Sequence, residues 1–465
     1  METSYPSGLI ILTALLCAGG FSGALWVYRD TLHPLIYLLP MGAFIYVYMP
    51  LNQSCQSMFS AYFSREQIEY VQLINFLSLA ALIIGCFLGG KRRRYGRGVA
   101  VGSGAQRIST EIKAGRITMV AMILGVPALL AYWWNIHLQG GLIAAYSEVK
   151  GGSAAAMSGY FRDPAFWAVS AAMLLLLGAA KKPLRIWHYV GVVVLIMPLL
   201  LQGFLASRRG PAFMGLVSVG TGWYLTQGKR PRLITLVASG GAIGLLLLCL
   251  VAFRADIYLG SNILSRVSVQ SGIERIDEQF SKETTGNEAF YGANVILSSR
   301  SHERHYWGKR FATILFIRPI PKQWWPTKYE DVGMGDYVVN AGLGSGDQLL
   351  ADVPEGAATG FAADLYLEFN LGGLVACGLI GWFFGRCWRK VCEGDNFAII
   401  NYGCLMAFSI FFVTQTIEAI ISRYLVVIIP TVLLWYWVIG LPHVPLSGFK
   451  RSRRQRIGPE ANPSP

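Results

Sequence analysis

Residues 233–253 read LITLVASGGAIGLLLLCLVAF, a run without a charged side chain. An α-helix needs about 20 apolar residues to cross the hydrocarbon core of a bilayer, and this run is of that length. No water is available in the core to satisfy backbone N–H and C=O groups, so the segment must satisfy them internally as a helix. The stretch therefore predicts a membrane-spanning helix.

Ten further segments have the same character, which gives eleven predicted spans in all. They are residues 7–28, 32–51, 71–90, 117–134, 164–180, 187–206, 211–227, 233–253, 360–384, 397–417 and 424–441. The fifth is one of the two shortest. The first is expected to be a retained span rather than a signal peptide, because no Lys or Arg precedes Arg29.

The composition excludes the soluble and disordered classes. Of the 465 residues, 54% are hydrophobic and only 14% are charged, whereas a soluble domain carries about 25% charged residues. The 8 Cys show neither a metal-ligand spacing nor the pattern of a disulfide scaffold. We therefore expect an all-α polytopic membrane protein with about eleven transmembrane helices and one large extracytoplasmic loop.

Basic residues indicate the orientation, since short loops rich in Lys and Arg stay cytoplasmic. Alternate connections carry them, namely residues 91–116, 181–185, 229–232, 386–390 and the tail 450–456. This pattern predicts a multi-pass membrane protein with an external N-terminus and a cytoplasmic C-terminus. The net charge of +14 is then explained by contact with anionic membrane lipids, and no nucleic-acid partner is expected.

The predicted organisation has four parts. Residues 1–253 hold helices one to eight, 254–359 form a large extracytoplasmic loop, 360–441 hold the last three helices, and 442–465 form a basic cytoplasmic tail. The loop contains thirteen of the chain's 26 acidic residues. Residues 268–288 have the pattern of a surface helix, and 311–327 that of an interfacial segment. Long loops are usually functional, so we expect a lid or a binding platform.

Two adjacent arginines stand out in the segment 203–220, GFLASRRGPAFMGLVSVG. Arg208 and Arg209 lie between apolar runs on the predicted outer side, where the charge rule disfavours them. A guanidinium binds phosphate oxygens through two parallel hydrogen bonds, which suits an anionic lipid-linked substrate near the bilayer surface. The alternatives are contact with ordinary lipid phosphates and an ion pair with the large loop.

Three segments together carry a family resemblance. Residues 203–220, residues 317–328 (IRPIPKQWWPTK) and residues 360–373 (GFAADLYLEFNLGG) resemble motifs of the Wzy-type O-antigen and oligosaccharide repeat-unit polymerases. Lys322 and Gln323 stand where that family often has Arg, and Asp364 occupies its usual Glu position. With the order of spans, the resemblance covers roughly residues 115–440.

The resemblance implies a membrane glycosyltransferase that makes surface polysaccharide from polyprenyl-pyrophosphate-linked oligosaccharides. It also implies a location in the bacterial inner membrane, with the N-terminus and the large loop 254–359 in the periplasm and the C-terminus in the cytoplasm. A sugar hydroxyl of the acceptor attacks the anomeric carbon of the donor glycan, and polyprenyl pyrophosphate leaves. A flippase and a chain-length regulator in the same membrane are the implied protein partners. No cofactor and no metal are expected, because the sequence shows no metal-binding or nucleotide-sugar motif.

Cations are needed where the pyrophosphate leaves, and a general base is needed at the acceptor hydroxyl. The cation candidates are Arg208, Arg209, Arg318 and Arg423, with Arg254 and Arg266 weaker because Asp256 offers Arg254 an ion pair. The base candidates are Asp364, Glu368, His302, His305 and Glu355. Asp364 and Glu368 are expected on one helical face, where they could alternatively serve only to complement the helix dipole. Glu418 is expected to pair with nearby Arg423.

Two other functions stay open at this point. An O-antigen ligase, or another glycosyltransferase that uses a lipid-linked sugar, shares the chemistry but not the acceptor. A flippase or transporter of such glycolipids would move the substrate without changing the mass of its glycan.

Overall fold

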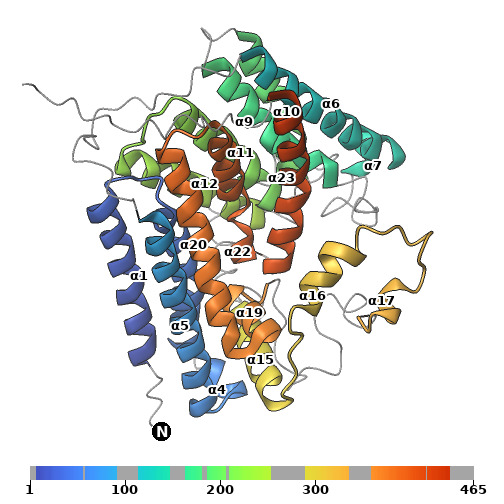
Figure 1. Ribbon diagram of the computed structural model, residues 1–465. Helices are drawn as coiled ribbons and strands as arrows, with labels where there is room; N and C mark the ends of the chain where they lie inside the picture. Colours follow the sequence, from blue (N-terminus) through green and yellow to red (C-terminus); the bar gives the residue numbers. More distant parts are fainter. Residues whose placement is uncertain are drawn as a thin grey trace, which may run out of the picture.

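A computed structural model describes residues 7–55, 58–91, 114–146, 163–180, 186–205, 209–252, 288–334, 358–414 and 416–439. Within these ranges every regular element is a helix (Figure 1). Eight of the described helices are long and apolar enough to cross a membrane. The protein is therefore an all-α polytopic membrane protein, as the sequence predicts.

All eleven expected spans contain helix. The first eight correspond to α1 (Ser7–Tyr28), α2 (Pro34–Ala43) continued by η1 (Phe44–Tyr48) and α3 (Met49–Cys55), α5 (Arg65–Gly90), α6 (Ala114–Leu138), η3 (Asp163–Phe166) with α9 (Trp167–Ala180), α10 (Ile186–Leu205), α11 (Arg209–Thr226) and α12 (Leu233–Ala252). Two short helices, α4 (Met58–Tyr62) and α7 (Leu142–Ala145), lie in the connections. The apolar runs thus locate the helices, with boundaries that differ by a few residues.

The fifth span, one of the two shortest, is buried inside the bundle. In α9 the residues from Ala168 to Ala179 are all buried. Helix α9 packs against α6, α10, α11 and α21 (Asn396–Phe408) (Figure 1). A helix that is apolar all round is a buried helix, which explains why this segment shows no polar face.

Glycines bring α5 and α20 (Gly373–Cys392) into backbone contact. A Cβ atom on Gly85 would collide with the carbonyl oxygen of Gly378, and one on Gly385 would collide with the carbonyl oxygen of Cys86. Small residues at such spacings let two membrane helices approach closely, so that packing and weak backbone contacts stabilise the pair. The α5–α20 pair is the closest helix contact along that side of the bundle (Figure 1).

The ninth predicted span lies within one candidate membrane span, Phe361–Cys392, but residues 360–384 do not form one continuous helix. Helix α19 (Phe361–Phe369) ends at Asn370, whose φ of 54° turns the chain, and η5 (Asn370–Gly372) leads into α20. A Cβ on Gly373 would lie 2.6 Å from the carbonyl oxygen of Leu365, so the start of α20 lies against α19. Every residue from Phe361 to Glu368 is buried.

The last two spans also begin and end elsewhere than predicted. Helix α21 ends at Phe408, a short α22 (Phe411–Thr414) follows, and α23 runs from Ile417 to Ile439. Glu418 and Arg423 therefore lie within the first two turns of α23 instead of before it. Helix assignment from apolar runs misses this start because Glu418, Ser422 and Arg423 interrupt the apolar run in the first two turns of α23.

The described parts of several basic loops meet at one end of the bundle. The Arg230 Nε atom lies 2.9 Å from the Asp30 carboxylate, and Arg389 Nη1 donates to the carbonyl of Lys91 at 3.0 Å. The Trp388 indole also donates to Asp30, at 3.1 Å. Alternate connections thus share one end, as the charge pattern predicts, and the assignment of that end to the cytoplasm remains a prediction.

The described part of the large loop lies at the opposite end of the bundle (Figure 1). It comprises α15 (Glu288–Ser301), α16 (Lys309–Ala312), η4 (Thr313–Ile317) and α17 (Lys328–Asp331). Helix α15 is buried from Gly292 to Ser299 and packs against α5 and α19. This part of the loop is therefore an integral layer of the fold.

Candidate active site

Arg310, in α16, is the centre of a buried ionic cluster. Its side chain is only 1% exposed, and its Nη2 atom lies 2.7 Å from Asp364 Oδ1 and 3.0 Å from Glu418 Oε2. Its Nη1 atom lies 3.6 Å from Glu368 Oε2. One guanidinium therefore faces three carboxylates, which come from α19 and α23.

Backbone hydrogen bonds fix the cluster in place. The N–H of Arg310 donates to Glu368 Oε1 at 3.2 Å, and the N–H of Trp307 donates to the carbonyl of Glu368 at 2.6 Å. Asp364 Oδ2 accepts from the N–H of Ile417 at 2.8 Å, so this carboxylate also caps the start of α23. The contacts join the large loop, α19 and α23 into one unit.

Gly308 sets the entry of the loop into this unit. Its φ of 87° lies in the left-handed region, where a residue with a side chain is strained. The backbone turns at Gly308, and α16 begins at the next residue, Lys309, followed by Arg310. Helix α16 continues directly into the π-helix η4. Short π-helical segments occur frequently at functional sites.

The cluster contains three carboxylates and one guanidinium, and most of it is buried. The side chains of Asp364 and Glu368 are 0% exposed, whereas that of Glu418 is 16% exposed. Burying charges costs several kcal/mol per ion unless partners and hydrogen bonds compensate. Ionisable groups retained inside a membrane protein are therefore functional candidates by default. Glu418 is the carboxylate of the three that is open to a substrate.

Two of the predicted cations lie on elements connected to this cluster. Arg423 lies five residues, about one and a half turns, along α23 from Glu418, and its guanidinium carbon sits 4.4 Å from the centre of the Phe411 ring. The start of α11 reaches the same ring, because a Cβ on Gly210 would lie 2.8 Å from it. Arg209 opens α11, so packing through Phe411 brings the backbone of one predicted cation near the other.

Arg318 follows η4, which packs against α23. Its Nη2 atom lies 3.7 Å from Asp163 Oδ2, and its side chain is 42% exposed. A half-exposed pair at this distance is worth little to stability. Arg318 is therefore placed to exchange Asp163 for an anionic ligand at the surface.

Lys328, the last residue of the IRPIPKQWWPTK segment, supports Arg318. Its ammonium donates to the backbone carbonyls of Ile317, at 3.0 Å, Arg318, at 3.1 Å, and Ile320. Burial lowers the pKa of Lys328, and the charges of Lys322 and Arg318 lower it further. Lys328 thus holds the turn that carries Arg318 and is a positioning residue.

The structure brings together only some of the predicted site residues. Asp364 and Glu368 share one face of α19, as predicted, and both meet Arg310. Glu418, predicted as a partner of Arg423, makes an ion pair with Arg310 in the large loop. Outside the described residues lie Arg208, Arg254, Arg266 and Glu355, together with the predicted surface helix 268–288 up to Glu288 and the side chain of Arg209.

The two histidines lie away from the carboxylate cluster. His305 Nδ1 is 3.1 Å from the carbonyl of Tyr366 and 3.3 Å from Ser299 Oγ, and exposed His302 contacts the carbonyl of Ser298. The Tyr366 side chain points to Tyr70, its hydroxyl 2.8 Å from that of Tyr70, on the other face of α19 from Asp364 and Glu368. The geometry therefore favours the carboxylates over the histidines as bases.

Arg310 is the residue that sequence reasoning missed. It is one of eleven Lys and Arg residues between 254 and 328, and its neighbours in the chain do not distinguish it. One feature of the sequence could have identified it, because Arg310 directly precedes the apolar run FATILF. A charge next to a run that packs into the protein needs a partner there. In the described parts of the chain, no group of three or more His, Cys, Asp and Glu side chains is arranged to hold a metal ion.

Comparison of the chain with protein-family models, curated proteins and solved structures finds no match.

Proposed function

We propose that the protein is a membrane glycosyltransferase that polymerises polyprenyl-pyrophosphate-linked oligosaccharide repeat units into surface polysaccharide on the outer face of the bacterial inner membrane. The observation that supports it most is the meeting of Asp364, Glu368 and Glu418 around Arg310, with Arg318 and Arg423 on the elements that flank them. The reaction needs a base and cations side by side, and this end of the bundle supplies both.

In the proposed step the acceptor hydroxyl loses its proton to Glu418, the most exposed carboxylate of the cluster. The hydroxyl oxygen forms a bond to the anomeric carbon of the donor glycan. The bond from that carbon to the pyrophosphate oxygen breaks, and polyprenyl pyrophosphate leaves with the electron pair. Arg310 and Asp364 orient Glu418, because they hold both its carboxylate and the start of its helix.

The cations act on the leaving group. Negative charge builds on the pyrophosphate as its bond to the sugar breaks, so guanidinium groups already in position stabilise the transition state more than the ground state. Arg423 and Arg318 serve this role, together with Arg209 at the start of α11. Metal is not required in this scheme, and chelator should leave the activity unchanged.

The test is to incubate the purified protein with lipid-linked repeat units from its own host and to resolve the glycans by size. A ladder spaced by one repeat unit supports the polymerase. Glu418→Gln should abolish the ladder while leaving the amount of folded protein unchanged, and Glu69→Gln, at an exposed carboxylate of α5, is the matched control. Full-length polymer from Glu418→Gln would exclude the proposed base.

The same assay addresses the predicted cation. Arg209→Ala should abolish chain extension without changing protein level or membrane insertion. Its control is Arg65→Ala, which removes an arginine whose side chain is 71% exposed. Normal polymer from Arg209→Ala would remove Arg209 from the site.

Transport of the glycolipid is the second candidate, and the break between α19 and α20 favours it. Transporters bind substrate at interrupted helices, where backbone groups and buried charges are available inside the membrane. Here the break at Asn370 lies next to a buried ionic cluster. Movement of the lipid across proteoliposomes with no change in glycan mass would support transport. Transfer of the glycan to lipid A core would support a ligase.

A further inference from the structure

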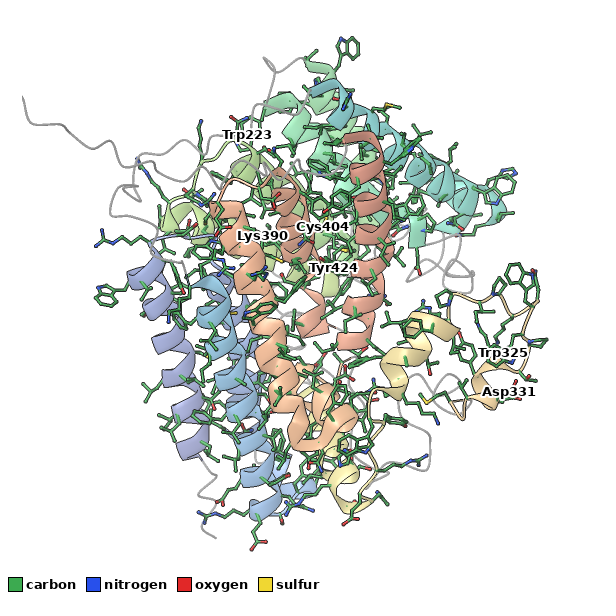
Figure 2. The ribbon with its side chains drawn as sticks, in the orientation of Figure 1. Trp223, Trp325, Asp331, Lys390, Cys404 and Tyr424 are labelled. Atoms are coloured by element: carbon green, nitrogen blue, oxygen red, sulfur yellow. The ribbon has the colours of Figure 1, made fainter. Side chains whose placement is uncertain are left out.

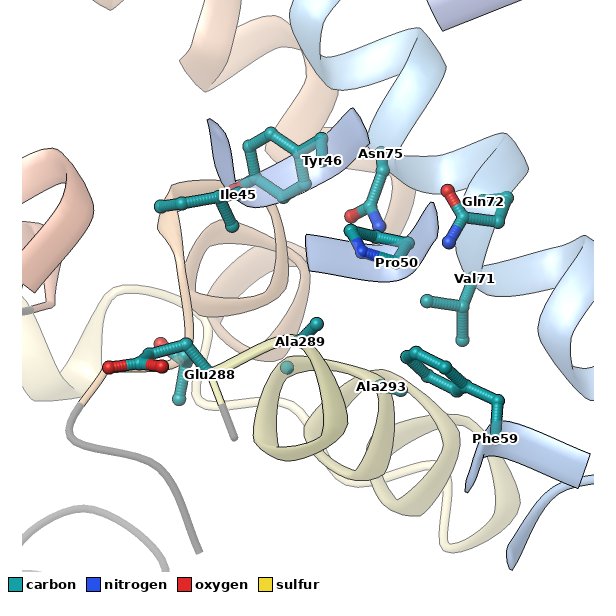
Figure 3. A pocket seen from close by; sticks show the side chains of 12 residues that line it. Ile45, Tyr46, Pro50, Phe59, Val71, Gln72, Asn75, Glu288, Ala289 and Ala293 are labelled. Atoms are coloured by element: carbon teal, nitrogen blue, oxygen red, sulfur yellow. The ribbon is translucent and has the colours of Figure 1, made fainter. Parts of the chain in front are cut away.

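A polar pocket lies on the opposite side of α19 from the carboxylate cluster, between η1, α4, α5 and α15. Figure 3 shows Gln72, Asn75 and Val71 projecting from α5, with Tyr46 and Pro50 opposite and Phe59 closing one side. The free volume between these residues is about 10 Å³, the space of roughly one water-sized group. The pocket is narrow, so it admits a group such as a hydroxyl and not a whole sugar ring.

Small residues of α15 create this space. Ala289, Gly292 and Ala293 line it at helical spacings of three and four, so one face of α15 presents almost no side chain to the pocket. A Cβ on Gly292 would lie 2.6 Å from the carbonyl oxygen of Thr359. The absence of a side chain at Gly292 thus allows the backbone just before α19 to lie against α15. A larger side chain here would fill the pocket.

The side-chain oxygen of Gln72 can accept a hydrogen bond from a ligand. Gln72 is 1% exposed, and its Oε1 atom has no hydrogen-bond partner among the residues that the structure describes. A buried acceptor without a donor costs about 1–3 kcal/mol. Such a group therefore favours a ligand that brings an O–H or N–H into the pocket.

The chemistry of the lining excludes an anion. Glu288 is the charged residue among those that line the pocket, and no lining residue carries a positive charge. A phosphate or pyrophosphate would be repelled by Glu288 and would find no cation. Amide groups and a carboxylate instead fit a hydroxyl group of a neutral ligand, because they pair with hydroxyls through hydrogen bonds.

The pocket is coupled to the candidate active site through Tyr46. The Tyr46 hydroxyl accepts from the N–H of Ala362 at 3.0 Å, and Ala362 lies two residues before Asp364 on α19. A ligand held beside Tyr46 is thus held against the first turn of the helix that carries the carboxylates. This arrangement separates a neutral side of the site from the cationic side around Arg318 and Arg423.

We propose that this pocket is a carbohydrate subsite, in which Gln72 accepts a hydrogen bond from one hydroxyl substituent of a neutral sugar that approaches from the partly exposed side of the pocket, at Glu288 and Ala289. The assignment rests on the proposed function, since it identifies the sugar as part of the lipid-linked glycan. It adds a residue that selects the glycan without taking part in the chemistry.

The test measures binding separately from catalysis. The probe is the free oligosaccharide released by mild acid from the host's lipid-linked repeat units, titrated against the full-length protein in lipid nanodiscs and observed by saturation-transfer NMR. Gln72→Met keeps the side-chain length and removes the acceptor. Gln227→Met, at the end of α11 near the basic loops, is the matched control.

We expect Gln72→Met to weaken glycan binding about tenfold, as the loss of one buried hydrogen bond predicts, and Gln227→Met to leave it unchanged. Equal binding by wild type and Gln72→Met, or no binding by wild type, overturns the subsite. If Gln72→Met does not fold, Ala289→Val, which narrows the pocket from α15, takes its place with the same expected loss.

The two proposals fail in different ways. Gln72-dependent glycan binding by a wild-type protein that forms no polymer would refute the polymerase and keep the subsite. Polymer formation by wild type and Gln72→Met with the same KM would refute the subsite and keep the polymerase.

Discussion

Replacing Arg310 by Met tests the central cluster. The substitution removes the guanidinium that lies 2.7–3.6 Å from the carboxylates of Asp364, Glu368 and Glu418, while a side chain of similar length remains. Two of these carboxylates are 0% exposed and would lose their cation inside the protein. Breaking a buried ion pair from one side costs about 3–5 kcal/mol, so we expect a loss of stability of that order.

The assay is thermal unfolding of the purified protein in one detergent, with Arg65→Met as the matched control. Arg65 pairs with Glu69 at 3.0 Å, but the two side chains are 71% and 44% exposed. An exposed pair contributes about 0–1 kcal/mol, so the control should unfold close to the wild-type temperature. The difference between the two variants isolates the effect of burial.

Two further measurements probe the same explanation. Acidifying the buffer should narrow the gap between Arg310→Met and wild type, because protonation neutralises the carboxylates that lost their partner. Adding Asp364→Asn to Arg310→Met should recover part of the lost stability, since one uncompensated charge is removed. If Arg310→Met unfolds at the wild-type temperature, the cluster does not hold the loop to the bundle and the reasoning is refuted.

Three other outcomes follow from the fold. Gly85→Leu should reduce the yield of monodisperse protein, because the new side chain would collide with the backbone of α20. Gly240→Leu is the control, because Gly240 faces open space and its substitution should leave the yield unchanged. Equal yields of the two variants would contradict the close α5–α20 packing. Hydrogen bonds from Trp325 and Thr327 lower the pKa of the exposed Asp331 carboxylate, which lies beside Trp325 in Figure 2. The Trp325–Asp331 hydrogen bond should therefore persist at neutral pH and be lost as the pH falls through that lowered pKa. The loss should change the indole fluorescence of the wild type and should be absent in Asp331→Asn. A cysteine at Ser281 should react with an impermeant reagent from outside the cell, and labelling only after permeabilisation would reverse the predicted orientation.

Much of the architecture could be predicted from the sequence because the signals are local. An apolar run of about 20 residues predicts a membrane-spanning helix whatever that helix packs against. For this reason all eleven predicted spans contain helix. Asp364 and Glu368 share a face because the helix repeat places residues four apart together. The prediction failed where a local signal was ambiguous, as at Asn370, where one residue with positive φ divides an apolar stretch into α19 and α20.

The polytopic helical fold, the shared side of the basic loops and the carboxylates at the start of the ninth apolar segment all follow from the amino-acid sequence. The contacts of those carboxylates follow only from the way the helices pack. Arg310 is 54 residues from Asp364 and 108 from Glu418, and no periodicity along the chain relates them. Their contact depends on how α16, α19 and α23 pack together. Helix formation is a local property, whereas the partner of a buried charge is set by the fold as a whole.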